Sequence, residues 1–173
     1  MAKEAAAEQQ EQGQWQGAVE ARLPSTPASA AWPHIASFCA LHRYLPGIDL
    51  CERAAGADGQ PGCVRYCASF APGTEEVARW AREELLELDD ATRRLDYAVV
   101  GSSIGFGRYV ASITVVPEEE EGEGCRLVWA FECEPVQGWS RDGLVGYLDG
   151  AIKGMAARIA AAAADRAGGD VAA

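Results

Sequence analysis

The chain has 173 residues, of which 49% are hydrophobic, so it is long enough for one domain with a sizeable core and too short for two. Its 26 acidic and 15 basic side chains give a net charge of -11, which repels the phosphates of nucleic acid and of anionic lipid. No apolar run approaches the roughly twenty residues that span a bilayer. We therefore expect neither nucleic acid nor a membrane as a partner.

Residues 1–14 are mostly Gln, Glu and Ala with almost nothing to bury, so we predict a mobile tail here. This stretch lacks the apolar centre of a secretory signal and the arginines of a transit peptide, which favours a cytoplasmic protein. Six cysteines in such a protein are expected to stay reduced. None forms a Cys-x-x-Cys pair, and we interpret them as small buried hydrophobic residues: Cys39, Cys51, Cys63, Cys67, Cys125 and Cys133.

The ordered domain should begin near residue 15, where apolar and polar residues alternate over 15–22 as in a strand with one wet face. Ser25 or Thr26 can then cap a helix that has Pro27 just inside its start. Apolar residues repeat at helical spacing after this point. Pro33 falls inside the repeat and should kink the helix or split it into two short pieces.

The middle of the chain reads as strands separated by turns rich in Gly, Pro and Asp. The clearest strands are residues 63–70, 96–101, 110–116 and 126–136. Residues 75–89 are ambiguous, because their Ala, Arg, Glu and Leu content on its own favours a helix. The acidic residues 118–121 lack the ligand spacing of a calcium loop, and a solvated turn is the favoured interpretation.

The last segment carries an apolar stripe at spacings of three and four: Leu144, Val145, Leu148, Ile152, Met155, Ile159 and Ala163. We predict a long amphipathic helix whose N-terminus suits Ser140 and Asp142 and whose end lies at Gly168-Gly169. Residues 168–173 then form a second disordered tail. Three glycines recur every fourth residue along one side of the helix: Gly146, Gly150 and Gly154. They indicate either tight contact with a strand or room for a ligand.

Searches for common catalytic and cofactor motifs fail. The glycine-rich residues 101–107 lack the Lys and Ser/Thr of a phosphate loop, so no nucleotide site is predicted. His34 and His42 have no metal ligand at a suitable spacing, and a zinc site would have to be assembled from distant segments. A nucleophilic triad is also disfavoured, because such a triad needs a histidine as its base and the chain has only two. We predict no metal and no cofactor, and any chemistry must rest on carboxylate, guanidinium and phenol groups.

Two segments resemble the plant lachrymatory-factor synthase family: Gly62-Cys63-Val64-Arg65-Tyr66, and residues 80–89, which begin Trp80-Ala81-Arg82-Glu83-Glu84-Leu85. Shorter matches extend the resemblance from residue 15 to about residue 160. That family belongs to the Bet v 1 and START-like group, which includes polyketide cyclase-like proteins. The resemblance implies an α+β helix-grip domain over residues 15–167. A curved seven-stranded antiparallel sheet would wrap around the long C-terminal helix, with two short helices near the N-terminus, and residues 75–89 would be a strand.

The resemblance also implies a site, because an arginine, a glutamate and two tyrosines line the synthase cavity and match Arg65, Glu83, Tyr97 and Tyr109. The family reaction converts an alkenyl sulfenic acid to a thial S-oxide, so a proton leaves one atom and returns to another. Glu83 would carry the proton, Arg65 would hold the S–O oxygen, and the tyrosine hydroxyls would orient the substrate, with Tyr109 assigned to catalysis and Tyr97 to binding. Further aromatic residues are expected at the pocket: Trp129, Phe131 and Phe106.

Two functions stay open at this point. The protein is either an isomerase of a sulfenic acid or a similar small unstable substrate, or a module that binds, carries or senses a small apolar or sulfur-containing metabolite. In the second case a buried Arg65–Glu83 ion pair serves structure alone. Residues 102–108 differ from the synthase pattern, which leaves the substrate's size and identity open. A monomer is expected, because no apolar seam is evident.

The abscisic acid receptor family is a second relative by resemblance, over residues 82–90. Its Ser-Gly-Leu-Pro-Ala gate and its His-Arg-Leu latch have no counterpart in this chain. Asp49 stands near the position of the lysine that anchors the hormone, and a negative charge there would repel the hormone's carboxylate. Hormone reception is therefore disfavoured.

Overall fold

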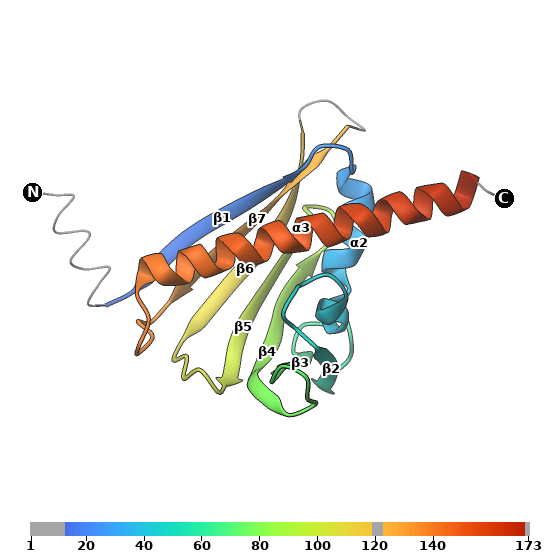
Figure 1. Cartoon of the computed structure of the whole chain (residues 1–173). Helices are drawn as coiled ribbons and strands as arrows, with labels where there is room; N and C mark the ends of the chain where they lie inside the picture. Colours follow the sequence, from blue (N-terminus) through green and yellow to red (C-terminus); the bar gives the residue numbers. More distant parts are fainter. Residues whose placement is uncertain (1–12, 119–122, 172–173) are drawn as a thin grey trace, which may run out of the picture.

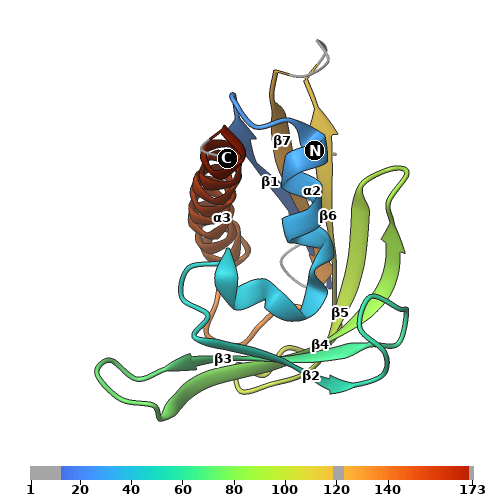
Figure 2. The same ribbon diagram turned by 90° about the vertical axis from the view of Figure 1, so that its right-hand side faces the viewer.

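The computed structural model describes residues 13–118 and 123–171 (Figure 1). The predicted N-terminal tail, the acidic turn at 118–121 and the last two residues of the predicted C-terminal tail lie almost wholly outside these ranges. Seven antiparallel strands form one sheet in the order β1-β7-β6-β5-β4-β3-β2. Figure 2 shows the sheet bending around the long helix α3, with a shorter helix, α2, beside it. The predicted helix-grip architecture is confirmed.

The strands fall close to the predicted ranges, and their bounds are β1 Trp15–Leu23, β2 Leu50–Ala55, β3 Val64–Phe70, β4 Val77–Asp89, β5 Arg94–Ser102, β6 Tyr109–Pro117 and β7 Cys125–Cys133. Strand β7 ends three residues before the predicted residue 136. The helical elements are α2 Ala28–Ala36, the 3₁₀ helix η1 Phe38–Arg43 and α3 Arg141–Val171.

Strand β4 shows how pairing overrides local propensity. Its composition favours a helix, yet it pairs with β3 on one side and with β5 on the other. Glu83 lies opposite Arg65 of β3 and opposite Val99 of β5. The backbone bonds to two neighbours outweigh a propensity difference of a few tenths of a kcal/mol per residue, about the scale expected for these residue types. The strand implied by the family resemblance is confirmed.

The two short helices near the N-terminus are confirmed, but the predicted cap is wrong. Pro27 itself occupies the position before α2, and no side chain caps the helix. Thr26 cannot serve because it belongs to the preceding turn, where its N–H donates to the Leu23 carbonyl. The helix continues through Pro33 and stops at Ala36, after which η1 begins.

Helix α3 covers the concave face of the sheet with its apolar stripe. Ser140 caps it as predicted, since its Oγ accepts a hydrogen bond of 2.9 Å from the N–H of Gly143. Five residues of the stripe are buried: Leu144, Leu148, Ile152, Met155 and Ile159. The helix continues to Val171, so the predicted end at Gly168-Gly169 is wrong. A glycine costs about 1 kcal/mol relative to alanine in a helix, which weakens the last turns without ending them.

Of the three glycines along α3, only Gly154 meets another segment. A Cβ at Gly154 would lie 2.7 Å from Cγ of Pro46, in the loop after η1. Gly146 and Gly150 are exposed, and no atom would lie within 4 Å of a Cβ at either. The close contact is therefore with a loop instead of a strand, and the other two glycines face open space. Within the described residues, no helix is long and apolar enough to cross a bilayer.

Candidate functional site

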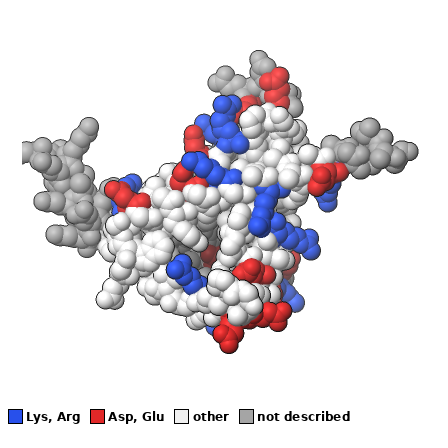
Figure 3. Space-filling model, viewed as in Figure 1, with Lys and Arg blue, Asp and Glu red and all other residues white. Residues whose placement is uncertain are grey.

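A cavity of about 140 Å³ lies between α3 and the concave face of the sheet. Strands β3 to β7, η1 and the loop that follows it contribute to its wall. On the face shown in Figure 3 the surface is hollowed below α3, among interspersed acidic and basic side chains. Most of the wall is apolar, with contributions from Leu41, Ile48, Val99, Ile113 and Leu148. A cavity of this size accommodates a molecule about as large as benzene.

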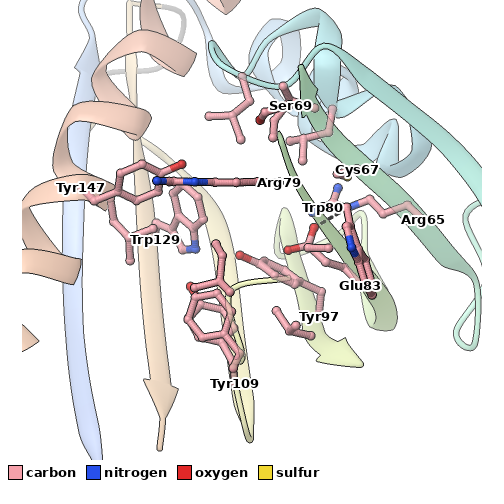
Figure 4. Close-up of a pocket in the computed structure, with 18 of the residues that line it drawn as sticks. Arg65, Cys67, Ser69, Arg79, Trp80, Glu83, Tyr97, Tyr109, Trp129 and Tyr147 are labelled. Atoms are coloured by element: carbon pink, nitrogen blue, oxygen red, sulfur yellow. Dashed lines mark hydrogen bonds and ion pairs between the residues drawn. The ribbon is translucent and has the colours of Figure 1, made fainter. Parts of the chain in front are cut away.

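Two charged side chains form one wall of the cavity, which we call the polar wall: Arg65 of β3 and Glu83 of β4 (Figure 4). Arg65 Nε donates a hydrogen bond of 2.8 Å to Glu83 Oε1, and the two side chains are 3% and 13% exposed. The pair forms because β3 and β4 place these residues directly opposite each other. Arg65 Nη1 donates a second hydrogen bond of 2.9 Å to the carbonyl of Phe38, so the guanidinium is fixed from two sides.

Arg65 remains protonated although its side chain is buried. Removal from water on its own would lower the pKa of this guanidinium, but the negative charge of Glu83 raises it, and the net shift is upward. The guanidinium also lies 4.0 Å from the centroid of the Phe38 ring, in cation–π geometry. The polar wall is therefore a fixed positive group with a carboxylate attached.

The adjoining wall, which we call the aromatic wall, consists of Tyr97 of β5, Phe106, Tyr109 of β6 and Trp129 of β7. It meets the polar wall at Tyr97, whose ring centroid lies 5.2 Å from the Arg65 guanidinium. The ring centroids of Tyr97 and Tyr109 are 6.2 Å apart, and Phe106 lies 5.1 Å from Tyr109. Burial raises the pKa of both tyrosine hydroxyls above the ordinary phenol value. Both hydroxyls are therefore protonated near neutral pH, and they lie within hydrogen-bonding reach of each other.

Trp129 places the N–H group of its indole ring in the wall of the cavity. The residue is 6% exposed, and its Nε1 makes no well-formed hydrogen bond among the described residues, although it lies close enough to the Tyr109 hydroxyl to lower the pKa of that group. Figure 4 shows this nitrogen on the side of the tyrosine hydroxyls. A buried donor without a partner costs about 1–3 kcal/mol. A ligand that places an oxygen here would remove that cost.

Six of the seven predicted site residues line this one cavity: Arg65, Glu83, Tyr97, Phe106, Tyr109 and Trp129. Phe131 is the exception, because it lies behind the lining. Its ring stacks on Tyr109 with 6.1 Å between centroids, and it packs close to Gly17 of β1 and Val145 of α3. The expected contact of Phe131 with a ligand is corrected to support of the Tyr109 ring.

Sequence reasoning missed two residues at the mouth of the cavity, Arg79 and Tyr147. Both are exposed, and Figure 4 shows Arg79 pointing across the mouth toward Tyr147 of α3. A signal for Arg79 is present in the sequence, since it precedes Glu83 by four residues on one strand and period two places both on one face. Tyr147 gives no such signal, because it adjoins the apolar stripe without being part of it.

The cysteines are all free thiols, and five of the six are buried. Cys67 lines the cavity and lies opposite Cys51 of β2, to which its thiol donates a hydrogen bond of 3.5 Å. This hydrogen bond, with the nearby charge of Arg65, lowers the pKa of Cys51 to about 6. The interpretation of the cysteines as small buried residues is confirmed for all except Cys39, which is half-buried.

Residues 15–164 match the family described as polyketide cyclase/dehydrase and lipid transport. The chain belongs to this family. Two solved structures are similar to it, the protein XoxI from Bacillus cereus and an uncharacterized protein from Bacillus thuringiensis. The first is 19% identical, with a TM-score of 0.67, and the match covers 87% of this chain and 96% of that one. The second is 18% identical, with a TM-score of 0.66, and the match covers 83% and 98%.

At these identities the two structures establish the fold alone. Family membership adds function of a general kind, because cyclisation, dehydration and lipid transport all require a cavity that encloses a small, largely hydrophobic molecule. The cavity described above meets that requirement. The protein is a small-molecule pocket protein of the polyketide cyclase/dehydrase family.

Proposed function

We propose that the pocket isomerises a small alkenyl sulfenic acid to a thial S-oxide, as the resemblance to plant lachrymatory-factor synthase implies. One observation carries this proposal: a buried Arg65–Glu83 pair lines the same cavity of about 140 Å³ as two protonated tyrosine hydroxyls. An alkenyl sulfenic acid with a three-carbon chain has a handful of heavy atoms and is within the size limit of such a cavity. The resemblance to the synthase family implies the same four residue types.

The reaction moves one proton and gains or loses no atom. The sulfenic acid O–H loses its proton and the C–S bond becomes a double bond. The C=C bond becomes a single bond as its distal carbon receives the proton. Glu83 suits the transfer because Oε1 is held by Arg65, while no other donor among the described residues binds this carboxylate. Oε2 is then free to take the proton and return it.

The remaining polar groups hold the oxygen that gives up the proton. Nε and Nη1 of Arg65 are engaged by Glu83 and Phe38, which leaves Nη2 for the substrate oxygen. The hydroxyls of Tyr97 and Tyr109 and the Nε1 of Trp129 add neutral polar groups in the same cavity. Donors that are fixed before the substrate arrives stabilise negative charge as it develops on that oxygen. We further propose a monomeric cytoplasmic protein that needs no cofactor.

A carrier or sensor of a small apolar metabolite is the second candidate function. The observation that favours it is the bond from Arg65 to the Phe38 carbonyl, because this bond ties η1 to the sheet. An ion pair anchored in that way stabilises the architecture whether or not the pocket catalyses a reaction. In the carrier, the same cavity binds its ligand and releases it unchanged.

The two candidates are separated by a product assay. Purified protein is added to an alliinase reaction that generates 1-propenyl sulfenic acid, and thial S-oxide is quantified by mass spectrometry. Glu83→Gln should lower product formation by about a hundredfold or more, as the loss of a general acid–base group does. Glu87→Gln, on the same strand but exposed, is the matched control and should behave as wild type. Product no higher than the alliinase blank would contradict the isomerase and leave the carrier.

A further inference from the structure

Three potential metal ligands meet outside the cavity, between η1 and the turn that joins β2 to β3. They are Cys39, Asp58 and Cys63, and their ligand atoms all lie within 4.8 Å of one another. The two sulfur atoms are 3.7 Å apart. Two thiolates on one tetrahedral zinc ion, each at about 2.3 Å, are about 3.8 Å apart. The thiols therefore already have the separation that a shared zinc ion requires.

Both thiols stand on backbone that other contacts hold in place. Cys63 is fully buried, its N–H donates to the Gln60 carbonyl, and its own carbonyl accepts a hydrogen bond of 2.7 Å from Leu85 of β4. Cys39 follows Phe38, whose carbonyl is bound by Arg65. Ligands on a fixed scaffold bind a metal without a large ordering cost.

The third ligand is placed differently. Asp58 is exposed and lies in a turn where Gly56 and Gly59 adopt positive φ angles of 73° and 78°. Its carboxylate already lies within 4.8 Å of both sulfurs, so a rotation of the exposed side chain is enough to bring an oxygen to a metal between them. Two fixed thiolates and one adjustable carboxylate leave a fourth tetrahedral position for water.

We propose that Cys39, Cys63 and Asp58 bind a zinc ion, with water as the fourth ligand. Thiolates favour zinc over magnesium and calcium, which prefer oxygen ligands alone. The site would tie η1 to the start of β3. It lies next to the pocket's scaffold, because Cys39 adjoins Phe38 and Cys63 is two residues from Arg65, the two residues that the 2.9 Å hydrogen bond joins.

The sequence gives no sign of this site. The two cysteines are 24 residues apart, and the short spacings of common zinc motifs are absent. The prediction of no metal site rested on spacing alone. The fold brings the ligands together only after η1 packs on the β2–β3 turn. The inference is independent of the proposed isomerase, because none of the three residues lines the cavity.

The test uses the full-length protein, reduced and kept under argon. Co²⁺ is titrated in as a spectroscopic substitute, and Zn²⁺ is then added as a competitor. We expect a thiolate-to-cobalt charge-transfer band that saturates at one equivalent and disappears when one equivalent of Zn²⁺ is added. Zinc should also raise the melting temperature, because it binds the folded protein.

Two variants and one control assign the site. Cys39→Ser should abolish the charge-transfer band, and Asp58→Asn should weaken zinc binding by at least about tenfold. Cys51→Ser is the matched control, since Cys51 and Cys67 form a second thiol pair, 3.5 Å apart, that is not part of the three-ligand cluster. Cobalt binding that survives Cys39→Ser, or is lost in Cys51→Ser instead, would overturn the proposal. So would reduced protein that binds no zinc. Asp58 is exposed, so Asp58→Asn remains informative even if Cys39→Ser fails to fold.

Discussion

The two walls of the cavity solve the problem of burying polar groups in opposite ways. On the polar wall, the charges of Arg65 and Glu83 are buried but satisfied by each other and by the Phe38 carbonyl. On the aromatic wall, the polar atoms are neutral, and the Nε1 of Trp129 has no partner among the described residues. The charged groups of the polar wall already have their hydrogen-bond partners before a ligand binds. A donor without a partner, by contrast, is stabilised when a ligand supplies an acceptor. Under the proposed function, the polar wall carries the chemistry and the aromatic wall recognises the ligand.

The largest effect is expected on the polar wall. Arg65→Met should lower the free energy of unfolding by about 3–5 kcal/mol, because it leaves the Glu83 carboxylate buried without its partner. Urea denaturation measures this change. Arg94→Met is the control, since the Arg94–Asp96 pair is exposed and such pairs contribute about 0–1 kcal/mol.

The double variant Arg65→Met, Glu83→Met sharpens the result. Removing both charges removes the unpaired carboxylate, so the double variant should be more stable than Arg65→Met alone. A double variant that is less stable than the single variant would show that the Glu83 carboxylate stabilises the fold without Arg65, which would contradict the cost expected for an unpaired buried carboxylate.

A smaller effect is expected on the aromatic wall. Trp129→Phe should weaken binding of a stable sulfoxide, such as methyl propyl sulfoxide, by about three- to tenfold, the equivalent of one hydrogen bond. Calorimetric titration measures the affinity. Trp32→Phe is a matched control, because Trp32 is equally buried but its Nε1 already donates a hydrogen bond of 2.8 Å to Asp90. Trp32→Phe should be less stable than wild type but bind the sulfoxide with the same affinity. Unchanged affinity in Trp129→Phe together with weaker binding in Trp32→Phe would show that Trp129 does not recognise the ligand.

The smallest effect concerns alkaline pH. Burial raises the pKa of Tyr97, whereas an unfolded tyrosine titrates near pH 10. Above about pH 10 the unfolded chain loses a proton that the folded protein keeps, so stability is fully present below that pH and falls as the pH rises further. Tyr97→Phe should make the decline less steep in urea midpoints measured between about pH 8 and 11. Tyr147→Phe, at a side chain that is 56% exposed, should leave the decline unchanged. Equal slopes in all three proteins would mean that Tyr97 is not held protonated.

Much of the fold could be predicted from the sequence, because period-two and helical spacings identify elements with one buried face. The strand β1 and the helix α3 are examples. Strand β2 gave no signal, since Cys51 is its one buried residue. The helix preference of residues 75–89 was misleading, because pairing with two neighbouring strands decides that segment and no local pattern records it.

The site could be predicted only in part, and for a different reason. Arg65 and Glu83 were found through a family resemblance, because nothing in their separation of 18 residues predicts that two strands place them opposite each other. Arg79 could have been found from its period-two relation to Glu83, whereas Tyr147 could not, because the position of α3 decides which of its side chains reach the mouth. Phe131 was misplaced because Tyr109 lies between it and the cavity.

The central claim is that the polar wall acts on the molecule that the aromatic wall recognises. The most direct test compares kcat and apparent KM for thial S-oxide formation in wild type, Glu83→Gln and Trp129→Phe. We predict that Glu83→Gln lowers kcat by about a hundredfold with little change in KM, and that Trp129→Phe raises KM with little change in kcat. A Glu83→Gln protein with the kcat of wild type would contradict the account.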